Sequence, residues 1–213
     1  MTEIIIDKIQ TEFLIKKLRE IFKPYIISEH NETVLNFNNE VGEGTFSIVT
    51  LENDKLNIYF KGKLNQLLEI KFYNAKQPAL NFIYLQRGNI HIKHGEAETC
   101  LIEGAAQQLI YSSTIKEEEI VSWPAEVEVE FNFLKVFDFP YLNSKLGELS
   151  SDIIFDDIIN ATEKPFTDIR AEKSSAILEN ESLLNSDLVG EARIKDLEQK
   201  IKNIFNVQLK ELF

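Results

Sequence analysis

The sequence predicts an α+β protein, in which an antiparallel β-barrel or sandwich carries an N-terminal helix and a C-terminal helical region. Apolar and polar residues alternate through residues 126–133, a period of two that places every second side chain on one face of a strand. Glycines lie between other short apolar runs, at Gly88, Gly95 and Gly104, where turns are expected. Large aliphatic residues recur three and four positions apart from Ile194 onward, which indicates the C-terminal helix.

The first element expected is a helix over residues 7–22, whose apolar residues form one stripe. Pro24 ends this helix, because the residue before a proline disfavours the helical region. A loop at residues 38–44 contains two glycines, which permit positive φ angles. The strands expected around this loop are residues 25–28, 33–37, 46–51 and 56–60.

The central strands differ in how they are covered. Residues 66–72 and 126–133 alternate, so each has one dry face and one face in water, including all three glutamates of the second strand. Residues 80–85 are apolar almost throughout, which indicates cover on both faces. Many short strands with turns between them are typical of a sandwich or a small barrel. The residues expected to face inward are Leu68, Ile70, Phe72, Val127, Val129, Phe131 and Phe133.

Strand-like alternation ends near residue 140. We therefore divide the chain into a helix-plus-barrel domain at residues 1–140 and a helical region at residues 141–213. The helices expected in this region are residues 151–159, 171–180 and 187–213. The last helix reaches the end of the sequence without a glycine, asparagine or proline stop. This predicts that a further module follows, and a natural terminus docked onto the barrel is the alternative.

The aliphatic stripe of the last helix is too apolar to leave in water. Burying one large aliphatic side chain stabilises a fold or an interface by roughly 1.5–3 kcal/mol. We expect the stripe to be buried against the chain's own helices or against a second copy, and favour a homodimer formed through these C-terminal helices. The stripe consists of Ile194, Leu197, Ile201, Ile204 and Leu212.

Composition limits the partners. The chain has 213 residues and a formal net charge of −12, and an acidic surface of this kind repels phosphate backbones. We expect no binding of nucleic acid by this chain itself. No apolar run approaches the ~18 residues of a membrane-spanning helix, and the N-terminus lacks the pattern of a secretory signal. A single cysteine, Cys100, excludes an internal disulfide, so we expect a reducing, cytoplasmic location.

No metal centre is expected. His91 and His94 are three positions apart, so in a strand their rings point to opposite faces, and no histidine follows them. A metal shell built on one strand needs two histidines on the same face. Cys100 has no histidine near it in the sequence and is interpreted as a structural thiol. Residues 117–119 are three glutamates, which we interpret as a solvated loop.

No catalytic residue and no cofactor are predicted, because nucleophile-elbow, phosphate-loop and dinucleotide motifs are absent from the sequence. Aromatic residues on or beside the expected barrel strands are the candidates for lining a small-molecule cavity, since such cavities are mostly apolar. The alternative is that these side chains fill the barrel. The residues are Phe72, Tyr84, Tyr111 and Trp123.

Four segments, in this order, resemble the N-terminal region of AraC-type bacterial transcription regulators, and in particular the branch common in Bacteroidetes and among siderophore-responsive regulators. They are residues 39–44, 67–72, 80–84 leading to Gly88, and 190–198. The resemblance implies a cupin-like barrel without catalytic metal, used for sensing or dimerisation, and a helical linker. Two helix-turn-helix units come next in that family, and nothing in this sequence corresponds to them.

The sequence therefore predicts the ligand-sensing and dimerisation domain of an AraC-type regulator. A small-molecule effector would bind in or at the mouth of the barrel, and DNA would be contacted only through the missing helix-turn-helix module. Two alternatives stay open: a cupin-type enzyme acting on a small molecule, and a purely structural pairing module. The enzyme should carry His-x-His and a distant histidine, which this sequence lacks.

Overall fold

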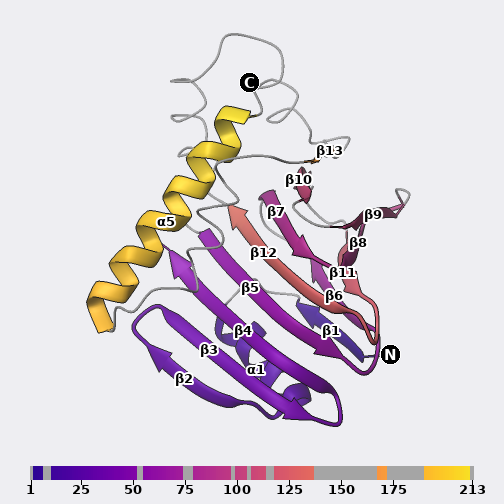
Figure 1. Ribbon diagram of the computed structural model, residues 1–213, viewed down its shortest axis with the longest axis vertical. Coiled ribbons are helices and arrows are strands. Elements are labelled where there is room, and N and C mark those ends of the chain that lie inside the picture. The colour runs from indigo at the N-terminus through magenta and orange to yellow at the C-terminus, as the bar shows by residue number, and fades with distance from the viewer. Residues whose placement is uncertain are drawn as a thin grey trace.

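The fold was determined as a computed structural model. It describes residues 2–6, 11–51, 55–73, 79–96, 99–104, 107–113, 118–136, 167–171 and 190–211. Within these residues the chain forms two β-sheets and two helices (Figure 1). None of the described helices is both long enough and apolar enough to cross a membrane.

The first sheet has five strands in the order β1-β6-β11-β8-β9. Its pairings are antiparallel except for that between β1 and β6, which is parallel and was not anticipated from the sequence. The strands are β1 (Thr2–Ile6), β6 (Leu68–Tyr73), β8 (Asn89–His94), β9 (Cys100–Glu103) and β11 (Glu118–Trp123).

The second sheet has eight strands in the order β13-β10-β7-β12-β5-β4-β3-β2, all antiparallel. The strands are β2 (Tyr25–Glu29), β3 (Glu32–Asn39), β4 (Gly42–Leu51), β5 (Lys55–Leu64), β7 (Ala79–Arg87), β10 (Gln107–Ser113), β12 (Glu128–Val136) and β13 (Thr167–Ala171). Every strand expected before residue 140 is present, although most extend beyond the expected ends.

The strand order is that of a jelly roll. Strands β5, β12, β7 and β10 are neighbours in one sheet, and β6, β11, β8 and β9 are neighbours in the other. The chain changes sheet at each step from β5 to β8 and again at each step from β9 to β12. Two four-stranded sheets connected in this way form the double-sheet architecture of the cupins. The predicted cupin-like antiparallel fold with an N-terminal helix and a C-terminal helix is confirmed.

Helix α1 (Thr11–Phe22) closes the inner face of the β3–β4 hairpin, with Leu14, Leu18 and Phe22 buried. The Phe22 ring lies 4.6 Å from that of Phe37 and 5.3 Å from that of Phe46, between ring centroids. The helix ends before Pro24, as predicted, and residues 7–10 of the expected range lie outside the described part of the chain.

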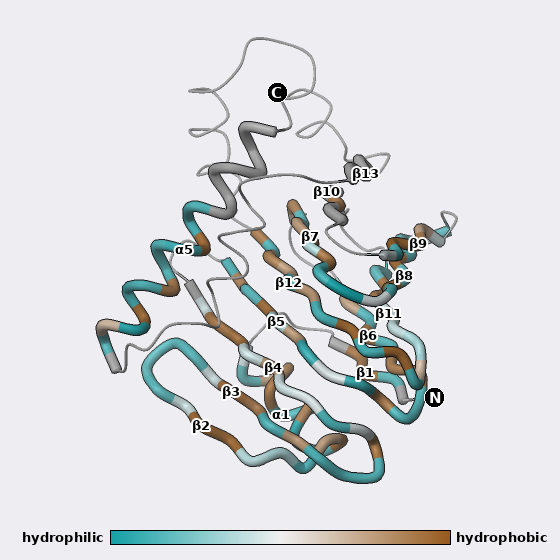
Figure 2. The backbone as a smooth tube through the Cα atoms, viewed as in Figure 1, coloured by the Kyte–Doolittle hydropathy of each residue, from teal (hydrophilic) through white to brown (hydrophobic). Residues whose placement is uncertain are grey.

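The inward faces of both sheets form one hydrophobic core. Leu68, Ile70 and Phe72 alternate into this core from β6, as the sequence predicts. Strand β7 is buried on both faces from its first residue through Leu85, which confirms the expected cover on both sides. Figure 2 shows the hydrophobic residues concentrated along the strands and the hydrophilic residues in the turns between them.

The outward face of the eight-stranded sheet is not the wet face expected from residues 126–133. Glu130 is buried, because the Tyr59 hydroxyl donates to it at 2.5 Å and the Lys61 ammonium lies 3.2 Å away. Leu134 and Val136, further along the same strand and face, are also buried. The expected strand also begins later, at Glu128. Of the three glutamates, Glu126 and Glu128 lie in water. The alternation therefore identified the strand but overstated how much of its outward face is exposed.

Two glycines allow strands β4 and β5 to approach closely. A Cβ atom at Gly62 would lie 2.6 Å from the Gly44 Cα atom, and one at Gly44 would lie 2.6 Å from the Lys61 carbonyl oxygen. Gly44 and Gly62 are direct partners in the ladder, so only residues without side chains fit there. The predicted loop at residues 38–44 is accordingly mostly strand, and only its middle forms a turn.

The region after residue 140 contains a strand that the sequence did not predict. Strand β13 pairs with β10 through five residue pairs and extends the eight-stranded sheet. Its last residue, Ala171, was expected to begin a short helix; the rest of that helix and the one expected at residues 151–159 lie outside the described residues. Helix α5 (Gly190–Glu211) confirms the main part of the predicted C-terminal helix and crosses the outward face of the eight-stranded sheet (Figure 1).

Candidate functional site

A charged cluster lies inside the jelly roll. Lys135 follows Phe131 and Phe133 on the inward face of β12, because inward and outward positions alternate along the strand. Its ammonium donates to the Glu119 carboxylate at 2.6 Å and to the Asn81 side-chain oxygen at 2.7 Å. Glu119 comes from β11 of the opposite sheet and Asn81 from β7. The exposed fractions of Lys135, Glu119 and Asn81 are 1%, 0% and 0%, so the cluster joins both sheets away from solvent.

Two aromatic rings also lie near the ammonium. Lys135 Nζ lies 5.2 Å from the Phe72 ring centroid and 5.4 Å from that of Phe133. These distances fall within the range of cation–π attraction, which strengthens when the cation is desolvated. Burial lowers the pKa of Lys135, and the Glu119 carboxylate opposes that shift. The groups that hold the ammonium thus include a carboxylate oxygen, an amide oxygen and two rings.

His94 lies beside this cluster. It pairs with Glu119 between β8 and β11, and it is buried on the same face as Ile90 and Ile92. His91 is half-buried on the other face, so the predicted opposite orientation of the two histidines is confirmed. The described residues include no group of three or more His, Cys, Asp or Glu side chains placed to hold a metal ion.

The four aromatic residues predicted to line a ligand cavity occupy different environments. Phe72 contacts the charged cluster. Trp123, at the other end of β11, packs against Phe60 and Phe131 with centroid distances of 5.5 and 5.3 Å. Tyr84 is buried on the outward face of β7, opposite Asn132, so its expected place in the barrel interior was wrong. Tyr111 pairs with Asn81 through its backbone, and its side chain lies outside the described part of the structure.

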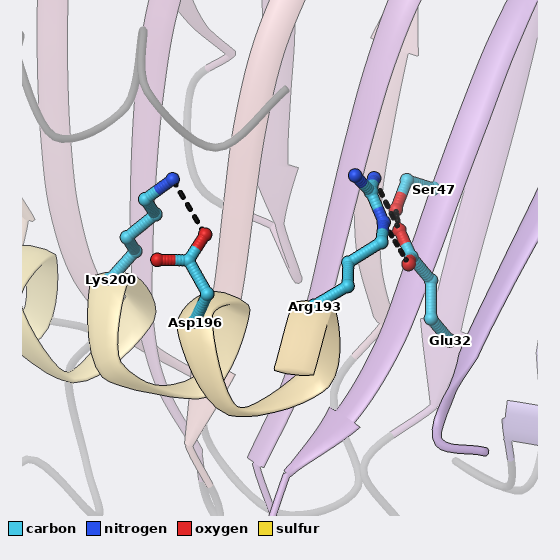
Figure 3. Close-up of polar contacts among 5 residues, drawn as sticks. All are labelled: Glu32, Ser47, Arg193, Asp196 and Lys200. Atoms are coloured by element: carbon cyan, nitrogen blue, oxygen red, sulfur yellow. Dashed lines mark hydrogen bonds and ion pairs between the residues drawn. The ribbon is translucent and has the colours of Figure 1, made fainter. Parts of the chain in front are cut away.

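A second polar cluster fastens helix α5 to the outside of the sheet (Figure 3). The Arg193 guanidinium donates to both carboxylate oxygens of Glu32, at 3.0 and 3.5 Å, and the Ser47 hydroxyl donates to the same carboxylate at 2.8 Å. One turn further along the helix, Asp196 and Lys200 form an ion pair of 2.8 Å on the side facing the strands (Figure 3). A forked guanidinium contact of this kind fixes orientation as well as contributing energy.

The predicted aliphatic stripe of α5 lies on this side of the helix. Ile194, Leu197 and Ile201 are 8%, 3% and 2% exposed in the single chain. These three side chains are therefore buried within one chain, without a second copy. Their helix packs on a sheet, whereas the sequence suggested that it packs on other helices of the chain or on a second copy. The Ile204 side chain and Leu212 lie outside the described residues.

Sequence reasoning missed the charged residues of both clusters. Extending the alternation of residues 126–133 by one more period places Lys135 inside, which was the available signal. Glu119 was interpreted as part of a solvated loop, and that was wrong: it lies on β11 with no exposed surface. The contact between Arg193 and Glu32 joins residues 161 positions apart, so no local pattern announces it.

No protein-family model matches the sequence, and no curated protein matches it. The chain is similar to solved structures with cupin folds. One is the cupin domain of Cnp3 from Schizosaccharomyces pombe, with a TM-score of 0.35 and 11% identity over 52% of this chain and 74% of that chain. Another is an RmlC-like cupin from Methanocaldococcus jannaschii, with a TM-score of 0.33 and 12% identity over 55% of this chain and 98% of that chain.

The chain is also similar to apo ToxT from Vibrio cholerae, with a TM-score of 0.46 and 11% identity over 74% of this chain and 56% of ToxT. The match thus spans little more than half the length of ToxT. At identities this low, all three similarities concern the fold alone.

Proposed function

We propose that this chain is the ligand-sensing and dimerisation domain of an AraC-type transcription regulator. The observation that carries the sensing role is the buried cluster of Lys135, Glu119 and Asn81 inside the jelly roll. The segments that resemble AraC-type regulators supply the context: they correspond to the β3–β4 turn, strand β6, strand β7 and the first turns of α5.

A purely structural pairing module has no use for such a cluster. Removing two charges from water costs several kcal/mol per ion, and replacing a buried pair by packed aliphatic residues is often neutral or stabilising by about 1–4 kcal/mol. An interior that keeps Lys135 and Glu119 therefore forgoes stability. A sensor gains from the same groups, because an effector that brings its own oxygen to the ammonium competes with Glu119 for it.

Strand β12 offers a route from this cluster to α5. Lys135 points inward, while its neighbours Leu134 and Val136 are buried on the outward face that α5 crosses. A displacement of Lys135 moves both faces of one strand. An effector changes the position of α5 only if it binds two arrangements of the protein with different affinity. A charged group that exchanges one partner for another provides this difference in affinity.

The remaining parts of the proposal concern partners. The chain would act as a homodimer, and DNA would be contacted through a helix-turn-helix module that this sequence does not contain. A dimer seam along α5, as the sequence suggested, would have to use residues other than Ile194, Leu197 and Ile201, because these are buried within one chain.

The sensing role is tested by ligand-induced stabilisation. The wild type and a variant with Lys135→Met and Glu119→Leu are screened by thermal unfolding against small carboxylates, phosphates and neutral polar metabolites. A compound at about 100 times its Kd stabilises the folded state by about 2.7 kcal/mol. We expect at least one anionic compound to raise the Tm of the wild type and not that of the variant.

The matched control is Lys63→Met, which removes an exposed lysine whose ion pair with Glu126 has a similar distance of 2.7 Å. Loss of the response in this control as well, or an unchanged response in the double variant, would show that binding does not involve the interior cluster. If no compound stabilises the wild type, the sensing role fails.

A further inference from the structure

Strand β2 leaves an apolar edge open in the described part of the eight-stranded sheet. Among the described strands it is terminal in that sheet, and its strand partner there is β3. Tyr25 is 71% exposed and Ile27 is 45% exposed. Because residues two apart share a face, both side chains lie on the outward face of the sheet, which α5 also covers. Figure 2 shows a hydrophobic stretch within β2, followed by the hydrophilic turn that leads to β3.

The backbone of β2 has hydrogen-bonding groups along this edge that pair with no described strand. Glu29 and Glu32 flank a two-residue turn, so they form a hydrogen-bonded pair, and such pairs alternate with non-bonded ones in an antiparallel ladder. The Ser28 and Thr33 hydroxyls, 3.2 Å apart, belong to the non-bonded kind, whose side chains lie closer. It follows that Ile26 and Ser28 direct their N–H and C=O groups away from β3.

We propose that β2 is the surface through which two copies of this chain pair. The two β2 strands run antiparallel about a two-fold axis at Ile27. Ile26 of one copy exchanges backbone hydrogen bonds with Ser28 of the partner subunit, and the reverse pair does the same. Ile27 then faces Ile27 of the partner subunit in the closely spaced, non-bonded position. The two eight-stranded sheets become one continuous sheet.

The edge is complementary to itself, which identifies the partner as a second copy. In this register the one charged residue of the strand, Glu29, lies opposite the phenol of Tyr25 of the partner subunit, and no like charges meet. Isologous contacts of this kind are the commonest in soluble oligomers. Pro24, which has no N–H group, limits the pairing to the five residues of β2.

The proposal rests on the dimerisation part of the function proposed above and gives that part a surface, but it does not depend on whether the interior binds an effector. It also places α5 relative to the dimer axis. The His30 imidazole, in the turn that ends β2, lies 3.8 Å from the Glu191 carboxylate in the first turn of α5. Pairing at β2 therefore sets the distance between the two copies of α5.

Mass in solution provides the first test. We expect the wild type to have twice the chain mass of 24.6 kDa by light scattering at micromolar concentration. Ile27→Arg places a charge on the axis opposite its own copy and should give 24.6 kDa. Leu101→Arg is the matched control, because Leu101 is equally exposed, at 45%, but lies on the five-stranded sheet. It should remain a dimer. Circular dichroism confirms that both variants are folded.

Cross-linking tests the register independently. In a Cys100→Ser background, which removes the only native cysteine, Ile27→Cys brings two Cα atoms to about 4.5 Å in the non-bonded pair. This lies within the roughly 4.4–6.8 Å range of disulfides. In Tyr25→Cys the equivalent atoms are about 13 Å apart at ~3.3 Å per residue. We expect a covalent dimer in air only from Ile27→Cys.

A monomeric wild type overturns the proposal, as does a dimer that survives Ile27→Arg. Equal cross-linking of both cysteine variants rejects the register. The thermal-unfolding assay with small molecules is repeated on the monomeric Ile27→Arg variant. Ligand binding is then measured without the dimer, so a wrong dimer surface and a wrong sensing role give different results.

Discussion

Breaking the interior ion pair from one side should destabilise the fold far more than removing both of its charges. The change is Lys135→Met, which keeps the length of the side-chain stem and removes the ammonium. Glu119 then retains a carboxylate with no exposed surface and loses a donor at 2.6 Å. The complementary changes are Glu119→Leu and the two together.

The magnitude follows from burial. Removing one partner of a fully buried pair destabilises a protein by about 3–5 kcal/mol, because the other charge is left uncompensated. Lys135→Met should therefore lower the free energy of unfolding by this amount, and the loss of contacts with Asn81 and two phenylalanine rings adds to it. The double variant removes both charges of this pair and should lie within about 1–2 kcal/mol of the wild type.

Urea unfolding followed by tryptophan fluorescence measures these values, since Trp123 is buried in the same core. The control is Lys63→Met, whose ion pair has a distance of 2.7 Å but exposed partners, and which should change the stability by less than about 1 kcal/mol. A coupling energy below about 1 kcal/mol between Lys135 and Glu119 would refute the argument that the pair is desolvated as a unit.

The same pair gives a pH dependence. Burial lowers the pKa of Lys135 below its ordinary value of 10.5. Between the lowered value and 10.5 the unfolded chain binds more protons than the folded chain, so the stability contributed by this group rises with pH. The wild type should gain stability relative to the double variant as the pH is raised through this window, and a relative loss would contradict the lowered pKa.

The remaining predictions concern α5 and binding. Leu197→Glu together with Ile201→Glu should release α5 from the sheet, seen as faster hydrogen exchange of its amides, whereas Gln199→Glu on the exposed side should not. Arg193→Met should weaken the same contact by about 1.5–3 kcal/mol, the usual value for hydrogen bonds to a charged group, and unchanged exchange in α5 would show that Glu32 does not hold the helix. The chain should give no mobility shift of duplex DNA at physiological salt, because its net charge is −12. Elemental analysis should find well below one transition-metal ion per chain, since His91 and His94 face opposite ways.

Local periodicity identified several elements of this protein, although it missed strands β1, β11 and β13. The alternation at β6 and β12, the apolar run of β7 and the stripe of α5 are properties of neighbouring residues, and each predicted the correct element. The same local information identified which side of β6 faces the core and that His91 and His94 point apart. These predictions hold because strand and helix periods follow from backbone geometry alone.

Tertiary structure decided which faces are covered and by what. Glu119 and Glu130 look like surface residues in the sequence, yet both are buried. Glu119 is paired with Lys135 of β12 in the opposite sheet, and Glu130 accepts a hydrogen bond from Tyr59 on the adjacent strand. Tyr84 is buried on the side opposite to the expected one, since β7 is covered on both faces and its apolar run does not say which side chains enter the interior. A charged side chain is buried only where another segment of the chain provides a partner. The periodicity of a strand or helix does not tell which distant segment lies against it.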